Sequence, residues 1–198
     1  MIDDLVPEIL KFISKPSHLS SACLVNRTFN RCASRLLYKH IAMYSSQKDV
    51  KQMVVLLFAT LSRSPTLASF VHRLEIYDFP KYITFHPGLG PNVVTAIENC
   101  TNLHKFAWTR EGTLDSDALL ALSSCPCLRE LKLSGSIHYP EMLLEFGELQ
   151  SISIIMPRSR VVWDLLPTWI ALNRNSLTSL ALVSAVSSFP TFVILRSF

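Results

Sequence analysis

The sequence predicts an α/β protein, in which a unit of three short helices is followed by a short, irregular array of strand–turn–helix repeats. Two observations support this fold class. The pattern Φ-x-x-Φ-x-Φ, where Φ is an apolar residue, recurs five times from Val71 onward. In the first forty residues the apolar side chains instead recur with the period of a helix. We therefore expect a helical domain over residues 1–41 and a repeat solenoid over residues 42–198, with parallel strands inside and helices outside.

Three short helices are expected in the N-terminal domain, where Asp4, Ser17 and Asn26 are placed to cap their N-termini. Their apolar faces, in chain order, are Ile9, Leu10 and Ile13, then Leu19, Ala22 and Cys23, then Phe29, Cys32, Ala33, Leu36 and Leu37. About forty residues are too few to close a core unaided. We therefore expect this unit to lean on a partner, on the rest of the chain, or on both.

The five repeat strands begin at first-Φ residues separated by 32, 25, 21 and 28 residues. These residues are Val71, Leu103, Leu128, Leu149 and Leu177. Helices are expected between the strands, over residues 91–100, 115–125, 139–146 and 161–173. Asp115 is the expected N-cap of the second of these helices. One strand–turn–helix unit cannot bury its own apolar face, so each repeat is expected to pack against its neighbours.

Within each repeat the second and third Φ should point into the core, because side chains alternate along a strand. The residues between them should then form rows on the concave side of the solenoid. The residues that we expect to contact a substrate there are Arg73, Glu75, Tyr77, Lys105, Thr109, Glu130 and Lys132. The early rows are charged, and the later rows are small and polar: Ser151, Ser153 and Ile155, then Ser179, Ala181 and Val183. The alternative, that all of these are ordinary solvent-facing residues, stays open.

Composition narrows the class of function. The 198 residues are 49% hydrophobic and 17% charged, which is typical of a folded chain. No apolar stretch approaches the roughly 20 residues that span a bilayer, so no membrane insertion is expected. The net charge of +4 is mild and forms no dense run, so nucleic acid is not an expected partner. The five cysteines include no C-x-x-C, which predicts free thiols and a cytoplasmic or nuclear location.

No motif for catalysis, phosphate binding or metal binding is present. G-x-S-x-G, G-x-x-x-x-G-K-[ST] and H-E-x-x-H are all missing, so we expect no enzyme, no cofactor and no metal. Cys100 and Cys125 each lie three residues before a repeat strand, and the shared position indicates a buried, apolar thiol. His72 and His104 also share one position of the repeat. We read these shared positions as repeat architecture.

Two resemblances rest on these motifs. Residues 71 to about 183 resemble leucine-rich repeats of the irregular, cysteine-containing type. Residues 4 to about 41 resemble an F-box, and the segments that carry this resemblance are Leu5-Val6-Pro7-Glu8-Ile9-Leu10, Leu24-Val25-Asn26-Arg27-Thr28-Phe29 and Leu36-Leu37-Tyr38. The F-box resemblance implies docking on the Skp-type adaptor of an SCF ubiquitin ligase. The domain behind the F-box would capture a substrate protein for ubiquitin transfer.

Carried over residue by residue, the resemblance implies that eight apolar residues face the adaptor: Leu5, Pro7, Ile9, Leu10, Ile13, Leu24, Val25 and Phe29. A first alternative is that these side chains pack only against the first repeat. A second is that the chain is a leucine-rich-repeat scaffold for protein binding, whose N-terminal helices are only a cap and which has no ubiquitin-ligase role.

Two further features complete the prediction. A basic residue recurs every four positions along the third helix, at Arg27, Arg31, Arg35 and Lys39. A solvated face is the favoured interpretation of this stripe, ahead of a contact with an acidic adaptor. The apolar segment over residues 187–198 lacks the polar face of a terminal cap, so we expect the chain to be a fragment of a longer solenoid.

Overall fold

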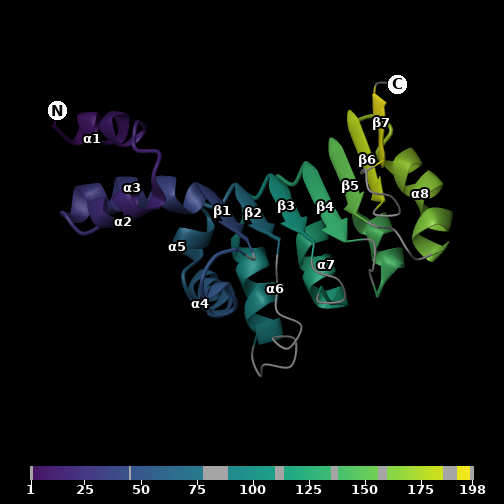
Figure 1. The fold of residues 1–198 in the computed structure, drawn as a ribbon, viewed down its shortest axis with the longest axis horizontal. Coiled ribbons are helices and arrows are strands. Elements are labelled where there is room, and N and C mark those ends of the chain that lie inside the picture. Colours follow the sequence, from purple (N-terminus) through teal and green to yellow (C-terminus); the bar gives the residue numbers. More distant parts are fainter. Residues whose placement is uncertain are drawn as a thin grey trace.

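The computed structural model describes residues 2–44, 46–77, 89–109, 114–134, 138–155, 160–184 and 191–196. They form an α/β structure around one sheet whose strands lie side by side in chain order (Figure 1). The strands are β1 His40–Met43, β2 Arg73–Ile76, β3 Lys105–Trp108, β4 Glu130–Ser134, β5 Ser151–Ile155, β6 Ser179–Ser184 and β7 Thr191–Arg196. Strands β1 to β6 are all parallel, and β7 pairs with β6 in the antiparallel direction. The sequence did not predict β7.

The helical unit stands beside β1 at one end of the row of strands (Figure 1). It consists of α1 Ile2–Leu10, α2 Pro16–Ala22 and α3 Arg27–Lys39. Asn26 caps α3 as predicted, because its side chain accepts a hydrogen bond of 2.9 Å from the Phe29 N–H. The other two predicted caps are wrong. Helix α1 begins at Ile2, before Asp4, and α2 begins with Pro16 in its first turn, which places Ser17 inside the helix.

The remaining helices pack against one face of the sheet; in Figure 1 they lie below the strands, except the last of them, which lies beside β6 and β7. They are α4 Val50–Arg63, α5 Pro65–Ala68, α6 Leu89–Asn99, α7 Ser116–Ser123, the 3₁₀ helix η2 Pro140–Glu145, and α8 Arg160–Leu172. Four of these lie within a few residues of the predicted helices, although η2 is a 3₁₀ helix. Asp115 caps α7 as predicted, since it accepts a hydrogen bond of 2.9 Å from the Ala118 N–H. The sequence did not predict α4 or α5.

The five copies of the strand pattern align in register, so equivalent residues sit side by side across β2 to β6. The second-Φ row, which the helices cover, is Leu74, Phe106, Leu131, Ile152 and Leu180. Strand β1 extends this register, because Ile41 pairs with Leu74. The segment Tyr38-Lys-His-Ile41-Ala-Met43 is therefore a further copy of the pattern. Strand β1 also spans the domain boundary expected at residue 41.

Besides the pairing of the strands, the backbone carbonyl directly after the first Φ of a repeat accepts two hydrogen bonds from the next repeat. The His72 carbonyl accepts hydrogen bonds from the N–H groups of His104 and Lys105, at 2.9 and 3.1 Å. The carbonyls of His104, Arg129 and Gln150 accept the same pair of bonds from the following repeat. The shared position of His72 and His104 thus belongs to the repeat architecture, as predicted.

Apolar side chains form two separate cores. The larger lies between the sheet and helices α4 to α8, and Trp108, Trp169 and Phe58 are among its fully buried members. The smaller lies within the helical unit and consists of Val6, Leu10, Leu19, Ala22 and Ala33. Full burial of a large apolar side chain contributes about 1.5–3 kcal/mol. The small core therefore gives the helical unit far less stability than the large core gives the sheet.

Candidate functional site

Among the residues of the helical unit whose burial is described, five large hydrophobic side chains are exposed, and we call them the helical face: Leu5, Ile9, Phe12, Leu24 and Val25. Leu5 and Ile9 follow each other at i and i+4 on α1, and a backbone bond from Phe12 N–H to Ile9 O continues the turn. Leu24 and Val25 form the turn between α2 and α3. Phe12 and Leu24 keep 88% and 86% of their surface open, a large exposure for side chains of this type.

The eight predicted adaptor-facing residues do not all lie on this surface. Leu10 is buried in the small core with 1% exposed, so its side chain is not available to a partner, and the expectation for it is corrected. Ile13 and Phe29 are half-buried against the same core, and Pro7 is also half-buried. The other four predicted residues belong to the helical face. Phe12 is exposed as well, but the sequence reading did not single it out.

The orientation of α1 explains this difference. The sequence placed Ile9, Leu10 and Ile13 on one apolar face of the helix, and the resemblance turned this face to the adaptor, whereas the structure buries Val6 and Leu10 and exposes Ile9. Val6 lies four residues before Leu10, so a pairing of these two residues was the signal in the sequence that would have identified the inner side.

The second candidate surface, which we call the sheet face, lies on the side of the sheet opposite the helices. Its side chains form the predicted rows, and β1 adds His40, Ala42 and Tyr44 to them. Over β2 to β4 the sheet face carries Arg73, Glu75, Tyr77, Lys105, Ala107, Thr109, Glu130, Lys132 and Ser134. Over β5 and β6 it carries Ser151, Ser153, Ile155, Ser179, Ala181 and Val183.

Glu75 is the centre of a charged network on the sheet face. Its carboxylate lies 3.2 Å from Nε2 of His40 and 3.4 Å from Nζ of Lys105. The Tyr77 hydroxyl donates a short hydrogen bond to the same carboxylate. Lys105 also reaches Glu130, at 3.7 Å. We expected Glu75 to face a substrate, but it is only 5% exposed, and its partners already satisfy it, so the expectation of a direct contact is corrected.

Two tyrosines and a lysine sit beside this network. The rings of Tyr44 and Tyr77 stack with their centroids 4.9 Å apart and their planes 6° from parallel. The ammonium of Lys132 lies 5.3 Å from the centroid of the Tyr77 ring, within the range of a cation–π contact. Because Lys132 on β4 reaches a side chain that follows β2, its alkyl chain crosses β3. Ala107, the β3 residue paired with Lys132, is fully buried.

The network shifts two pKa values in opposite directions. Burial alone raises the pKa of Glu75, but the hydrogen bond from Tyr77 and the charges of Lys105 and His40 outweigh it, so the net pKa lies below its ordinary value. Burial and the adjacent Glu75 raise the pKa of Tyr77. At neutral pH Glu75 is therefore ionised, while Tyr77 keeps its proton and remains a hydrogen-bond donor.

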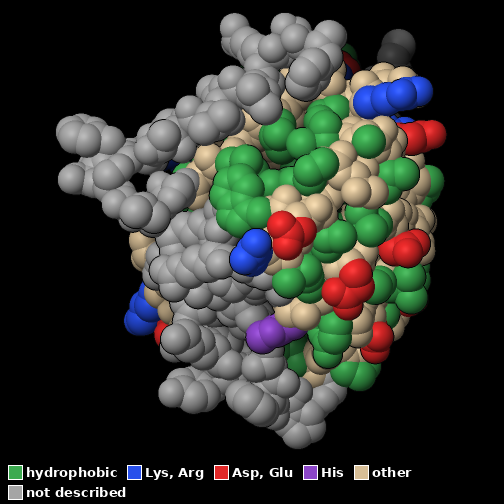
Figure 2. All heavy atoms as spheres, turned by 90° about the vertical axis from the view of Figure 1, so that its right-hand side faces the viewer, with side chains coloured by type: hydrophobic (Ala, Val, Ile, Leu, Met, Phe, Trp, Pro, Cys, Tyr) green, Lys and Arg blue, Asp and Glu red, His purple; other side chains and the backbone are tan. Residues whose placement is uncertain are grey.

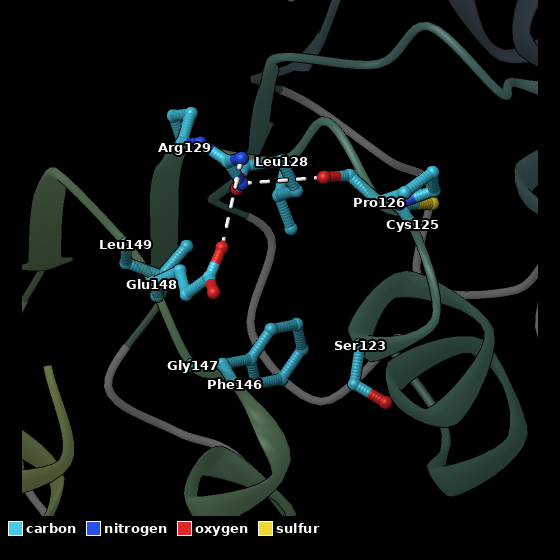
Figure 3. A pocket seen from close by; sticks show the side chains of 9 residues that line it. All are labelled: Ser123, Cys125, Pro126, Leu128, Arg129, Phe146, Gly147, Glu148 and Leu149. Carbon is cyan, nitrogen blue, oxygen red and sulfur yellow. Dashed lines mark hydrogen bonds and ion pairs between the residues drawn. The ribbon is translucent and has the colours of Figure 1, made fainter. Parts of the chain in front are cut away.

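A cavity of about 220 Å³ opens between the α7–β4 and η2–β5 connections (Figure 3). On its wall, Arg129 lies 3.7 Å from Glu148 and donates a hydrogen bond of 3.3 Å to the Pro126 carbonyl. The Ser123 hydroxyl donates to the Leu120 carbonyl at 2.8 Å. Burial and the nearby Cys127 raise the pKa of the lining thiol Cys125 to about 11. That thiol is protonated at neutral pH, so the lining holds polar groups that join two repeats but no activated nucleophile.

The end of the molecule that carries α8 is also partly apolar. Figure 2 shows hydrophobic side chains gathered there, with acidic side chains among them. On α8 the exposed members are Val161, Trp163 and Leu172. A second cavity, of about 270 Å³, lies where the helical unit meets β1, and its lining includes Leu10, Leu37 and His40. Of the residues named here, Leu10 alone was predicted as part of a site.

The repeat cysteines behave as predicted for small buried groups. Cys100 is fully buried and Cys125 is partly buried, and all five cysteines are free. Burial and the neighbouring Cys125 raise the pKa of Cys100 to about 12. In the described part of the chain, no group of three or more His, Cys, Asp or Glu residues is arranged to hold a metal ion. Among the same residues, no helix is long and apolar enough to cross a membrane.

Comparison with protein-family models, with curated proteins and with solved structures finds no match for this chain. The helical face and the sheet face are thus the two candidate binding surfaces of the described residues.

Proposed function

We propose that this chain is the substrate-recognition subunit of an SCF-type E3 ubiquitin ligase. In this role the helical unit acts as an F-box that docks on the Skp-type adaptor, and the strands and helices behind it form a leucine-rich-repeat solenoid that binds a substrate protein. The chain would work in the cytoplasm or nucleus, where its five free cysteines stay reduced.

The observation that carries this proposal is the helical face. The side chains of Leu24, Val25 and Ile9 pack neither into the small core nor into the large one. The first alternative was that these side chains pack only against the first repeat. Their exposure speaks against it. Each large apolar side chain gains about 1.5–3 kcal/mol when it moves from water into a full contact. A partner that covers these side chains would also stabilise a helical unit whose own core is small.

Binding to a purified Skp-type adaptor tests the proposal. We expect the wild-type chain to co-purify with the adaptor and the double variant Leu24→Asp, Val25→Asp to lose at least tenfold in affinity, because two carboxylates would be buried at an apolar contact. Both residues are exposed, so the substitutions should leave the fold intact. Phe29 is left unchanged, since its side chain packs against the small core.

The matched control is Leu120→Asp, a change of the same chemistry at a half-exposed leucine of α7. It should bind the adaptor as the wild type does. If the Leu24 and Val25 variant retains full affinity, or if the wild-type chain does not bind the adaptor at all, the adaptor-docking role is wrong. Circular dichroism of each variant separates loss of binding from loss of structure.

A protein-binding scaffold with a helical cap is the second candidate, and one observation favours it. Helix α3 runs directly into β1, so the helical unit is continuous with the first repeat strand. Tyr38 packs against the large core, and the Arg35 guanidinium lies 5.3 Å from the centroid of the Phe70 ring. A scaffold of this kind would bind a protein partner with no affinity for the adaptor, so the adaptor experiment also separates the two functions.

A further inference from the structure

The charges of the sheet face are unevenly distributed. Over the six parallel strands β1 to β6, its charged side chains all lie over β1 to β4, whereas β5 and β6 carry only serine, alanine, isoleucine and valine. Over β2 to β4, three cations (Arg73, Lys105 and Lys132) face two carboxylates (Glu75 and Glu130). One net positive charge therefore remains when His40 is neutral.

The two carboxylates are already used within the face. Glu75 is buried and contacts His40, Lys105 and Tyr77, and Glu130 lies 3.7 Å from Lys105. A cationic ligand would therefore have to displace Lys105 to reach either carboxylate. This arrangement disfavours a basic partner, because each displaced pair loses about as much as a new pair gains.

The other two cations, Arg73 and Lys132, do not pair with these carboxylates. Arg73 is exposed, and neither it nor Lys132 forms an ion pair with a carboxylate in the described part of the chain. Lys132 is instead held over the Tyr77 ring, which stacks on Tyr44 and is bonded to Glu75. The Lys132 ammonium is thus pre-positioned, and this lowers the entropic cost of binding an anion.

The spacing of these two cations sets a scale for the ligand. Arg73 lies on β2 and Lys132 on β4, two strands apart and offset by two residues in register. Strands are about 4.8 Å apart and rise about 3.3 Å per residue, so the two Cα atoms are roughly 12 Å apart. An extended peptide covers about that distance in three to four residues.

We propose that the sheet face over β2 to β4 binds an extended acidic protein segment, in which two carboxylates three or four residues apart pair with Arg73 and Lys132. This inference rests on the proposed function, for which it names the chemical class of the substrate. The segment continues over β5 and β6, where small side chains leave the surface without bulky or charged obstacles. Lys105, between the two cations, stays paired to Glu75 and Glu130 and keeps the floor of the site in place.

A protein segment fits this face better than a nucleic acid does. A duplex presents a continuous row of phosphates and takes its affinity from many cations at once. The sheet face offers two unpaired cations among the described residues, and two carboxylates lie beside them. Carboxylates at this density would repel a phosphate backbone, whereas a peptide with two acidic residues needs only the two free cations.

Selection from a random peptide library tests the inference on the chain alone, without any adaptor. Phage displaying random twelve-residue peptides are selected on the immobilised wild-type chain. We expect Asp and Glu to be enriched at least threefold over the input, with pairs spaced three or four residues apart. Synthetic peptides from the selection should bind the double variant Arg73→Glu, Lys132→Glu at least tenfold more weakly than the wild type. This difference in affinity should be smaller at high salt, because salt screens the charges.

The matched control is Arg160→Glu, Arg174→Glu, which changes the net charge equally through two exposed arginines on and just after α8. It should change peptide affinity less than twofold. The neutral pair Arg73→Gln, Lys132→Gln repeats the measurement if the glutamate variant does not fold. Selected peptides without acidic enrichment, equal losses in both double variants, or tighter binding of a 20-base-pair duplex would each overturn the inference.

The same variants separate this inference from the proposed function. Arg73 and Lys132 lie on the sheet, away from the helical face, so their substitution should leave adaptor binding unchanged. If adaptor binding is normal but peptide affinity is the same in the wild type and in the variants of Arg73 and Lys132, the proposed substrate class is wrong and the ligase role stands. Acidic peptide binding without adaptor binding removes the ligase role and leaves the acidic ligand in place.

Discussion

At the scale of single residues, the buried carboxylate of Glu75 shows how a position can satisfy the sequence pattern and still differ from its expected role. Strand alternation correctly places Glu75 on the side of the sheet opposite the helices. Its burial depends on side chains from other strands, namely His40 from β1 and Lys105 from β3. His40 lies 35 residues before Glu75 in the chain, and Lys105 lies 30 residues after it. No local sequence pattern therefore identifies these neighbours.

Substitution of Glu75 should reveal this network through the pH dependence of stability. We expect Glu75→Gln to lower the free energy of unfolding by about 1–3 kcal/mol at pH 7, because Lys105 and Tyr77 lose a charged partner in a buried place. The pKa of Glu75 is lower in the folded chain than its ordinary value of 4.5. Its contribution is thus fully present above about pH 4.5 and is lost as pH falls through the folded-state pKa. Urea unfolding followed by tryptophan fluorescence at pH 7 and at lower pH measures the difference.

Glu130→Gln is the control for this measurement, since Glu130 is half-exposed and forms one ion pair at 3.7 Å. An exposed or half-exposed pair of this kind is worth about 0–1 kcal/mol. A wild-type advantage over Glu75→Gln that stays constant from pH 7 down to pH 3 would contradict the role given to the ionised carboxylate.

At the scale of elements, the last two repeats are joined by a buried side-chain amide, that of Asn173, which lies outside the strand pattern. Asn173, at the end of α8, is 1% exposed. Its side chain accepts a hydrogen bond of 2.7 Å from the Leu149 N–H and donates bonds of 3.0 Å to the carbonyls of Phe146 and Trp169. One side chain thus satisfies backbone groups of two successive repeats, as a buried polar residue must.

Removal of this amide should be costly. We expect Asn173→Ala to lower the free energy of unfolding by about 2–4 kcal/mol, because the buried Leu149 N–H loses its partner and the carbonyls of Phe146 and Trp169 each lose one of two hydrogen bonds. The exposed neighbour Arg174 provides the matched control, and Arg174→Ala should change stability by less than about 0.5 kcal/mol. Urea denaturation measures both. Equal stabilities for the two variants would mean that other groups, or water, satisfy these backbone atoms.

The elements also show which parts of the fold the sequence could predict. The repeat pattern located β2 to β6, because parallel strands that are covered on one face must repeat their apolar positions. The same pattern at Tyr38–Met43 marks β1, but the apolar period of α3 runs into it without a break, so this copy was not counted among the repeats. Helix α4 was missed for another reason. Its buried residues Val50, Val54 and Phe58 have helical spacing, but the run from Met53 to Ala59 is apolar throughout and hides it.

The candidate sites were predictable to different degrees. The rows of the sheet face followed from strand alternation alone, and the register bears them out. The helical face was only partly predictable, because α1 is apolar on two sides. Which side points inward depends on how α2 and α3 pack against it, through Leu19 and Ala33, and sequence period does not determine that. The contacts among His40, Glu75 and Tyr77 required the three-dimensional structure.

At the scale of the whole molecule, the chain contains two cores of very different size joined through one continuous helix and strand. The small core holds α1 and α2 against α3. The last turn of α3 instead packs on the sheet through Tyr38. Units of about forty residues are marginally stable by themselves. The helical unit should therefore open in local fluctuations that leave the sheet folded.

A pair of core substitutions tests this division. Leu10→Ala removes a fully buried side chain of the small core, and Leu119→Ala removes one of the large core, each at an expected cost of about 2–5 kcal/mol. All three tryptophans of the chain, Trp108, Trp163 and Trp169, lie in the repeats. The fluorescence unfolding midpoint should therefore fall in Leu119→Ala and stay close to that of the wild type in Leu10→Ala.

Hydrogen exchange measures the opening of the helical unit directly. In Leu10→Ala the amides of α1 and α2 should exchange at nearly the rate of an unfolded chain, while those of β2 to β5 keep their protection. If the helical unit docks on the adaptor as proposed, a saturating adaptor should restore protection to α1 and α2 by mass action, since it would bind only the folded unit. A shift of the fluorescence midpoint in Leu10→Ala as large as in Leu119→Ala would contradict the division. In that case the helical unit and the sheet unfold as one cooperative body, as a solenoid with a helical cap is expected to do.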